Sequence, residues 1–127
     1  MIRKNRIGIG IATLAVSLTA LTGAAGAAGA AKSTVSITGD NGDYYGYVHS
    51  SDAANCENDR KVTVFKQLGA TPDRSVDQKI GSDTASPNGP DAMWSIGNSG
   101  FKTGKFYAKA AKVPGLCKAA TSPTITR

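Results

Sequence analysis

The sequence predicts an all-β fold, in which about seven strands form a two-sheet sandwich in a single small domain. After Ser33 no 11-residue window has the periodicity of an amphipathic helix. Instead, β-branched and aromatic residues recur in short alternating runs, and clusters rich in Gly, Pro, Asn and Asp separate these runs. Short strands at this spacing, with turn signals between them, are typical of a sandwich.

Each expected strand is one of these runs. In chain order they are residues 34–38, 45–50, 61–66, 79–84, 92–96, 105–110 and 121–126. Successive side chains of a strand point to opposite faces of its sheet. This alternation places the following residues on core-facing sides: Val62 with Val64, Trp94 with Ile96, and Phe106 with Ala108 and Ala110. Segment 85–91 is rich in Pro, Asn and Gly, and we expect a turn there.

The N-terminus has the order of a secretory signal peptide. Three basic residues lie within the first six positions, the apolar run 7–21 follows, and small residues fill 23–30. A membrane-spanning helix needs about 20 strongly apolar residues. The run here is shorter and contains Gly and Thr, so we expect no stable membrane insertion.

Small residues precede two possible cleavage points, after Ala27 and after Ala30, and we favour the second. The chain then divides into a signal peptide (1–30) and a β-sandwich domain (31–127). We expect the domain to be secreted, either extracellular or associated with the cell wall.

The charge of the chain falls when the signal peptide is removed. The whole sequence has 15 Lys+Arg against 9 Asp+Glu, a formal net charge of +6. Three of the basic residues lie in the signal peptide, so the domain keeps 12 and a formal charge of +3. These are spread along the chain and no nucleic-acid-binding motif accompanies them, so we expect no nucleic-acid partner.

Cys56 and Cys117 are the two cysteines of the chain, and both lie in the exported part. An even number of cysteines in a small secreted domain predicts a disulfide bond between them. The alternative is a nucleophilic cysteine paired with His49. A bridge is the better interpretation, because no third thiol is present.

Catalytic and metal chemistry finds little support in the sequence. His49 is the single histidine, which excludes sites that need two imidazoles. Residues 97–100 (Gly-Asn-Ser-Gly) resemble the sequence around the nucleophile of chymotrypsin-like proteases, but those enzymes are about twice as long, and we interpret 97–100 as a loop. The acidic residues lack the spacing of a calcium loop. We therefore expect no catalytic residues, no metal site and no cofactor.

Four short motifs follow one another in the order found in one family. They are Gly46-Tyr47-Val48, Val62-Thr63-Val64, Thr84 with Asn88-Gly89 before Trp94, and Gly104-Lys105-Phe106-Tyr107-Ala108. In this the chain resembles the carboxypeptidase regulatory-like, or transthyretin-like, β-sandwich domains. The resemblance implies an immunoglobulin-like sandwich that serves as an accessory or binding module. Ala85 stands where the family usually has Asp, and the C-terminal Tyr-Arg-Gly-Ser of the transthyretin-related hydrolases is missing, so their activity is not implied.

Two expected strands carry aromatic and basic residues on the side opposite the core. These candidate ligand-binding residues are Tyr45, Tyr47, His49, Lys105, Tyr107 and Lys109. Exposed tyrosines beside lysines are suited to stacking on sugars or docking a protein. The same pattern also fits an ordinary solvated sheet face, which we favour from the sequence alone, and a single binding surface is the hypothesis beside it.

These observations predict a secreted, non-catalytic β-sandwich module that binds an extracellular protein or an envelope polysaccharide. A second hypothesis is a small secreted inhibitor that presents loop 85–91 or 97–103 to a protease or another hydrolase. A third is a secreted hydrolase that depends on His49 or on carboxylates.

Overall fold

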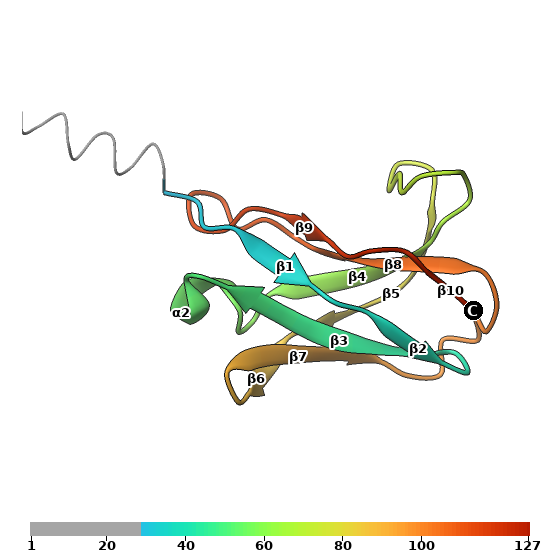
Figure 1. Cartoon of the computed structure of the whole chain (residues 1–127), viewed down its shortest axis with the longest axis horizontal. Helices are drawn as coiled ribbons and strands as arrows, with labels where there is room; N and C mark the ends of the chain where they lie inside the picture. The colour runs from blue at the N-terminus through green and yellow to red at the C-terminus, as the bar shows by residue number, and fades with distance from the viewer. Residues whose placement is uncertain (1–28) are drawn as a thin grey trace, which may run out of the picture. The chain divides into compact units, whose positions relative to one another are not determined.

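The computed structural model describes residues 29–127, and residues 1–28 of the predicted signal peptide lie outside this range. The chain forms ten short strands and one short helix here (Figure 1). They are β1 (Ser33–Val35), β2 (Thr38–Asp40), β3 (Asp43–Ser50), α2 (Ala53–Cys56), β4 (Lys61–Lys66), β5 (Gln78–Thr84), β6 (Ser86–Asn88), β7 (Asp91–Ile96), β8 (Lys105–Ala110), β9 (Ala120–Thr121) and β10 (Ile125–Thr126). Within the described range, no helix has the length and apolar character needed to cross a membrane.

The strands form two antiparallel sheets, which confirms the all-β, two-sheet prediction. In the first sheet the order is β1-β3-β7-β6, and β2 also pairs with β3. In the second sheet the order is β10-β8-β4-β5, and β9 also pairs with β8. Both sheets lie one over the other in Figure 1. β3 and β8 therefore belong to different sheets, and the side chains that they point away from the core emerge on opposite outer faces.

Two of the expected strands are interrupted, each for a local reason. In the expected strand 34–38, the Ser36 hydroxyl accepts a hydrogen bond from the Tyr47 amide at 2.9 Å. The Ser36 carbonyl oxygen also lies close to Gly46, where a Cβ atom would come within 1.9 Å of it. This interruption divides the expected strand into β1 and β2. Both pair with β3 in the same register. Near the C-terminus, Pro123 has no N–H to donate to a ladder, and it lies between β9 and β10.

The expected turn at 85–91 is wrong in part, because Ser86–Asn88 forms the edge strand β6. Pro87 is tolerated there, since an edge strand leaves one side of its backbone unpaired. Ala85 is buried just before this strand. Its carbonyl oxygen accepts a hydrogen bond from the Asp59 amide, and its amide donates to the Arg60 carbonyl oxygen. The chain thus leaves the second sheet at Thr84 and enters the first at Ser86.

The core lies between the two sheets and contains the residues expected from alternation. Val62, Val64, Trp94 and Phe106 are all fully buried. Tyr44 reaches into the same cluster from β3, where its ring centroid lies 4.7 Å from that of Phe106. Burial of this apolar surface is the main stabilising contribution in a fold of this size.

One end of the sandwich is held by a disulfide bond and a buried arginine. Cys56 and Cys117 are bonded, with their Cα atoms 5.6 Å apart, which confirms the predicted bridge. Arg60 is 1% exposed, and its guanidinium donates to the carbonyl oxygens of Cys56, Ala111 and Lys118 and to the hydroxyl of Ser33 at 2.8–3.0 Å. The side chain therefore joins four separate segments of the chain beside the disulfide.

Candidate functional site

The structure separates the six candidate ligand-binding residues into two groups. Tyr45, Tyr47 and His49 lie on β3 in the first sheet, and Lys105, Tyr107 and Lys109 lie on β8 in the second. The first three side chains point outward, as expected. Because the two strands lie in different sheets, the hypothesis of one continuous binding surface is wrong.

The expected exposure of Tyr107 is also wrong, because this side chain is only 1% exposed. Its ring stacks on that of Phe65, its cross-strand neighbour on β4, with the centroids 5.4 Å apart. Its hydroxyl donates to the Asp77 carboxylate at 2.6 Å. Both aromatic rings lie on the outer side of the second sheet, where residues 67–77 fold back over them.

Asp77 holds the 67–77 segment in this position. Its carboxylate accepts hydrogen bonds from the amides of Leu68 (2.9 Å) and Asp73 (2.7 Å) in addition to the Tyr107 hydroxyl. Burial by itself raises the pKa of the Asp77 carboxyl, but these three hydrogen bonds to the ionised form outweigh it, and the pKa lies below its ordinary value. Burial and the hydrogen bond to Asp77 both raise the pKa of the Tyr107 hydroxyl.

These two pKa shifts predict a pH dependence of stability with a defined sign. Tyr107 ionises at a higher pH in the folded state than in the unfolded state. Its contribution to the free energy of unfolding is therefore complete below about pH 10, where an unfolded tyrosine ionises. This contribution is lost as the pH rises toward the folded-state pKa. The slope for one proton is at most about 1.4 kcal/mol per pH unit. For Asp77 the contribution is present above the unfolded-state pKa of about 3.9 and is lost as the pH falls through the lower folded-state pKa.

Urea unfolding at a series of pH values measures this dependence. Above pH 10, Tyr107→Phe is expected to lose less stability with rising pH than the wild type. Below pH 4, Asp77→Asn is expected to lose less stability with falling pH than the wild type. Tyr47→Phe, on the exposed face of β3, is the matched control for the first variant. An alkaline limb that is as steep in Tyr107→Phe as in Tyr47→Phe contradicts the role given to the Tyr107–Asp77 contact.

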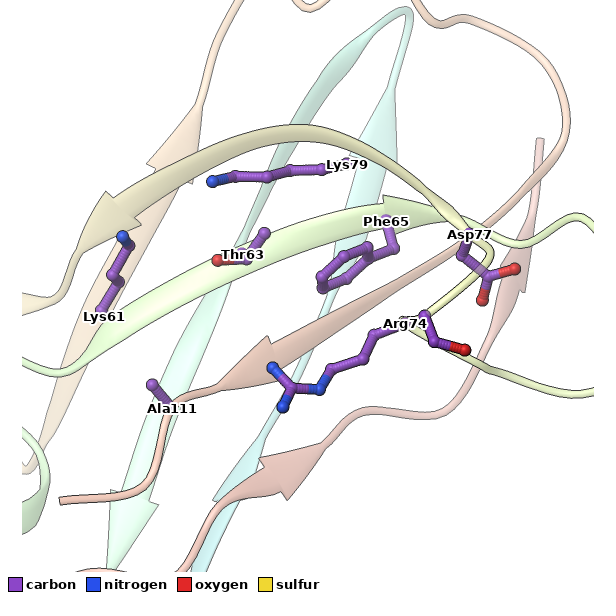
Figure 2. A pocket seen from close by; sticks show the side chains of 8 residues that line it. Lys61, Thr63, Phe65, Arg74, Asp77, Lys79 and Ala111 are labelled. Carbon is purple, nitrogen blue, oxygen red and sulfur yellow. The ribbon is translucent and has the colours of Figure 1, made fainter. Parts of the chain in front are cut away.

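A hollow of about 600 Å³ opens beside this contact on the outer face of the second sheet. Its walls come from β4, the start of β5, the residue after β8 and the 67–77 segment (Figure 2). The lining residues are Lys61, Thr63, Phe65, Arg74, Ser75, Asp77, Lys79 and Ala111. We call this site the cationic hollow. In Figure 2, Thr63 and Phe65 lie in the middle of it, between Lys79 and Arg74.

The hollow carries an excess of positive charge. Lys61, Arg74 and Lys79 line it, and Lys109 lines two smaller hollows that share Arg74 with it. Between residues 29 and 127 the ion pairs within 4.0 Å are the two that His49 makes, so none of these four cations has a carboxylate partner. Asp77 is the one acidic residue in the lining, and both of its oxygens already accept hydrogen bonds. A concave surface lined by one sign of charge concentrates ligands of the opposite sign.

The serine of the protease-like string 97–100 has a local structural role. The Ser99 hydroxyl donates to the Gly42 carbonyl oxygen at 2.6 Å and accepts the Phe101 amide at 3.1 Å. Gly42 directly precedes β3, whereas His49 lies near the other end of that strand. The structure therefore does not bring Ser99 and His49 together as a nucleophile and its base.

Sequence reasoning missed Lys61, Arg74 and Lys79. The alternation that places Val62 in the core also points Lys61 outward, so this part of the signal was present in the sequence. Lys79 and Arg74 had no comparable signal, because their approach to β4 depends on the pairing of β5 and on the fold of the 67–77 segment.

Comparison with known proteins adds no family assignment. No protein-family model matches the chain, and a search of curated proteins gives no match either. The resemblance to carboxypeptidase regulatory-like and transthyretin-like domains therefore stays a prediction.

Proposed function

We propose that this protein is a secreted, non-catalytic module that binds an anionic envelope polysaccharide in the cationic hollow. The observation that carries the proposal is the group of three cations without carboxylate partners, Lys61, Arg74 and Lys79, in one hollow. Lys109 adds a fourth such cation in the smaller hollows that share Arg74 with it. The predicted signal peptide and the disulfide bond support an extracellular location.

The rest of the lining suits a sugar polymer. The Thr63 hydroxyl can donate to and accept from the hydroxyls of a sugar. The Ser75 hydroxyl already donates to the Asp73 carboxylate, so it can only accept from a sugar. Phe65 and the stems of the lysines supply apolar surface between the charges. Carboxylate or phosphate groups of the polymer would pair with the cations, and Arg74 offers a planar guanidinium that binds either group in a bidentate manner.

The inhibitor hypothesis receives less support from the geometry. Residues 86–88 of the first proposed loop pair with β7, so much of its backbone is already engaged in a hairpin. In the second loop, Asn98 donates a hydrogen bond to Asp43, and Ser99 donates two to the Gly42 carbonyl oxygen, at 2.6–3.1 Å. These donors are therefore already engaged within the domain.

The test is the affinity of the protein for defined polymers, measured by titration calorimetry at low and high salt. Poly(glycerol phosphate) and polygalacturonate supply phosphate and carboxylate charges, and dextran is the neutral control. An exposed ion pair contributes up to about 1 kcal/mol. The double reversal Arg74→Glu/Lys79→Glu is therefore expected to weaken binding of an anionic polymer by about tenfold or more. High salt should weaken it as well, because exposed charges are screened.

Lys102→Glu/Lys118→Glu is the matched control, since it changes the net charge by the same amount at two exposed positions outside the hollow. It should retain most of the wild-type affinity. Equal loss in both double variants, or equal binding of dextran, contradicts the proposal. So does the absence of binding to both anionic polymers.

A further inference from the structure

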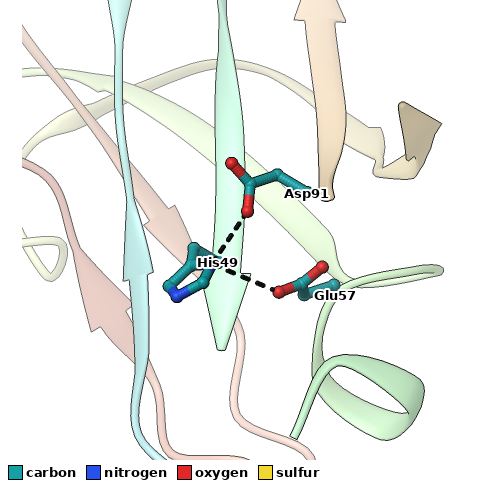
Figure 3. A group of neighbouring side chains, drawn as sticks. All are labelled: His49, Glu57 and Asp91. Carbon is teal, nitrogen blue, oxygen red and sulfur yellow. Dashed lines mark hydrogen bonds and ion pairs between the residues drawn. The ribbon is translucent and has the colours of Figure 1, made fainter. Parts of the chain in front are cut away.

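A second cluster of side chains lies on the first sheet, away from the cationic hollow. It consists of His49 near the end of β3, Glu57 directly after α2, and Asp91 at the start of β7 (Figure 3). The His49 Nδ1 atom lies 2.8 Å from an Asp91 carboxylate oxygen and 3.5 Å from a Glu57 carboxylate oxygen. One ligand atom from each residue falls within a group 4.8 Å across.

The backbone sets the positions of all three residues. Val48 and Ala92 are partners in the β3–β7 ladder, so the next residue on β3, His49, lies opposite Asp91. Glu57 follows Cys56, which the disulfide bond to Cys117 holds in place. The Glu57 carboxylate is also oriented by the Ser50 amide, which donates to it at 2.8 Å.

The donor set has a definite chemical preference. A neutral imidazole nitrogen with two carboxylate oxygens suits Zn²⁺ and similar first-row transition metals, whereas Ca²⁺ takes oxygen ligands. Zinc bonds of about 2.0–2.2 Å in a tetrahedron place the ligand atoms about 3.3–3.6 Å apart. The separation of 3.5 Å between His49 Nδ1 and Glu57 lies in that range, and the separation of 2.8 Å between His49 Nδ1 and Asp91 is shorter, as a hydrogen bond is.

The three side chains also meet the other requirements of a site. The hydrogen bond from the Ser50 amide to Glu57 is an outer-shell contact of the kind that orients metal ligands. His49 has 65% of its side chain exposed, so the imidazole ring is open to solvent. Two carboxylates close to one imidazole are also a favourable electrostatic environment for a dication.

We propose that His49, Glu57 and Asp91 form a Zn²⁺ site with three protein ligands and a fourth position open to water or to a donor from a partner. The ion takes the position between His49 Nδ1 and Asp91, and Nδ1 binds it through the lone pair of the neutral ring. The single N–H of that ring is then on Nε2, and solvent carries the proton from one ring nitrogen to the other. This site does not depend on the polysaccharide-binding function, because the two surfaces lie on different sheets and share no residue.

The test uses the protein without an affinity tag, so that His49 remains its only histidine. Zn²⁺ titration should give saturable binding of one ion per chain and should shift the imidazole NMR signals of that single histidine. His49→Gln and Asp91→Asn should each weaken Zn²⁺ binding by about 100-fold or more, since even outer-shell changes cost 10–100-fold. Asp40→Asn, which alters an exposed carboxylate outside the cluster, should leave the affinity unchanged.

Several results would overturn the proposal. One is the absence of saturable Zn²⁺ binding, and another is binding that leaves the His49 imidazole signals unmoved. A third is Ca²⁺ binding as tight as Zn²⁺ binding, which would indicate an oxygen-only site. Circular dichroism melting of each variant without metal separates the loss of a ligand from the loss of the fold. If a replacement unfolds the protein, the NMR titration of the wild type still decides the question.

Discussion

Removing the disulfide bond with Cys56→Ala/Cys117→Ala is expected to lower the free energy of unfolding by roughly 4 kcal/mol. The bridge closes a loop across a sequence separation of 61 residues, which greatly restricts the unfolded chain. In the folded state it joins the end of α2 to the turn that precedes β9. Stabilities of small domains are typically about 5–15 kcal/mol, so a large share of the total depends on this bond.

Urea unfolding of the oxidised wild type and of the double variant measures the difference. Under a strong reductant the wild type should fall to nearly the stability of the variant, since both then lack the bridge. A reduced wild type that stays as stable as the oxidised protein contradicts the prediction.

Replacing Arg60 by alanine is expected to destabilise the domain by about 3 kcal/mol. The fully buried guanidinium satisfies three carbonyl oxygens and one hydroxyl, and the truncated side chain leaves these groups without a donor. The lost packing of the long side chain adds to this effect. Burial lowers the pKa of Arg60, but a guanidinium remains protonated at neutral pH, so the donors are present there.

Two comparisons make the Arg60 prediction specific. Arg60→Lys keeps the charge but lacks the planar array of donors, so its stability should lie between those of the wild type and Arg60→Ala. Lys61→Ala, at the exposed neighbouring position, should change the free energy of unfolding by less than about 0.5 kcal/mol. A loss below about 1 kcal/mol in Arg60→Ala would show that water replaces the lost donors.

Much of the fold could be predicted because it depends on local patterns. Alternation along 61–66 and 105–110 identified β4 and β8 with their bounds, and it placed Val62 and Phe106 in the core. The pairing of Cys56 with Cys117 followed from their number and from the predicted export. Signals of this kind lie within a few residues of one another or in the composition of the chain.

The two proposed sites depend on contacts between distant parts of the chain, which local patterns do not show. Tyr107 has the alternation of an exposed residue, yet it is buried because Asp77, 30 positions away, binds its hydroxyl. Similarly, β3 and β8 have comparable outward faces, but only the sheet topology shows that these faces are opposite. His49, Glu57 and Asp91 are far apart in the sequence and meet through strand pairing and the disulfide bond.

The disulfide bond also limits how far the domain lengthens under tension. The backbone amide of Ala31 donates a hydrogen bond to the Leu116 carbonyl oxygen, next to the disulfide bond. The backbone of Arg127 is hydrogen-bonded to Gly104, and this C-terminus lies at the opposite end of the strands in Figure 1. A force applied to these two positions therefore acts along the strands and shears their ladders. Even after the sheets separate, the disulfide bond keeps the chain between Cys56 and Cys117 in a closed loop. On the order of 200 Å of contour length therefore does not contribute to the extension. In the oxidised state the domain therefore extends by less than its full contour length, and reduction of the disulfide bond releases the remainder.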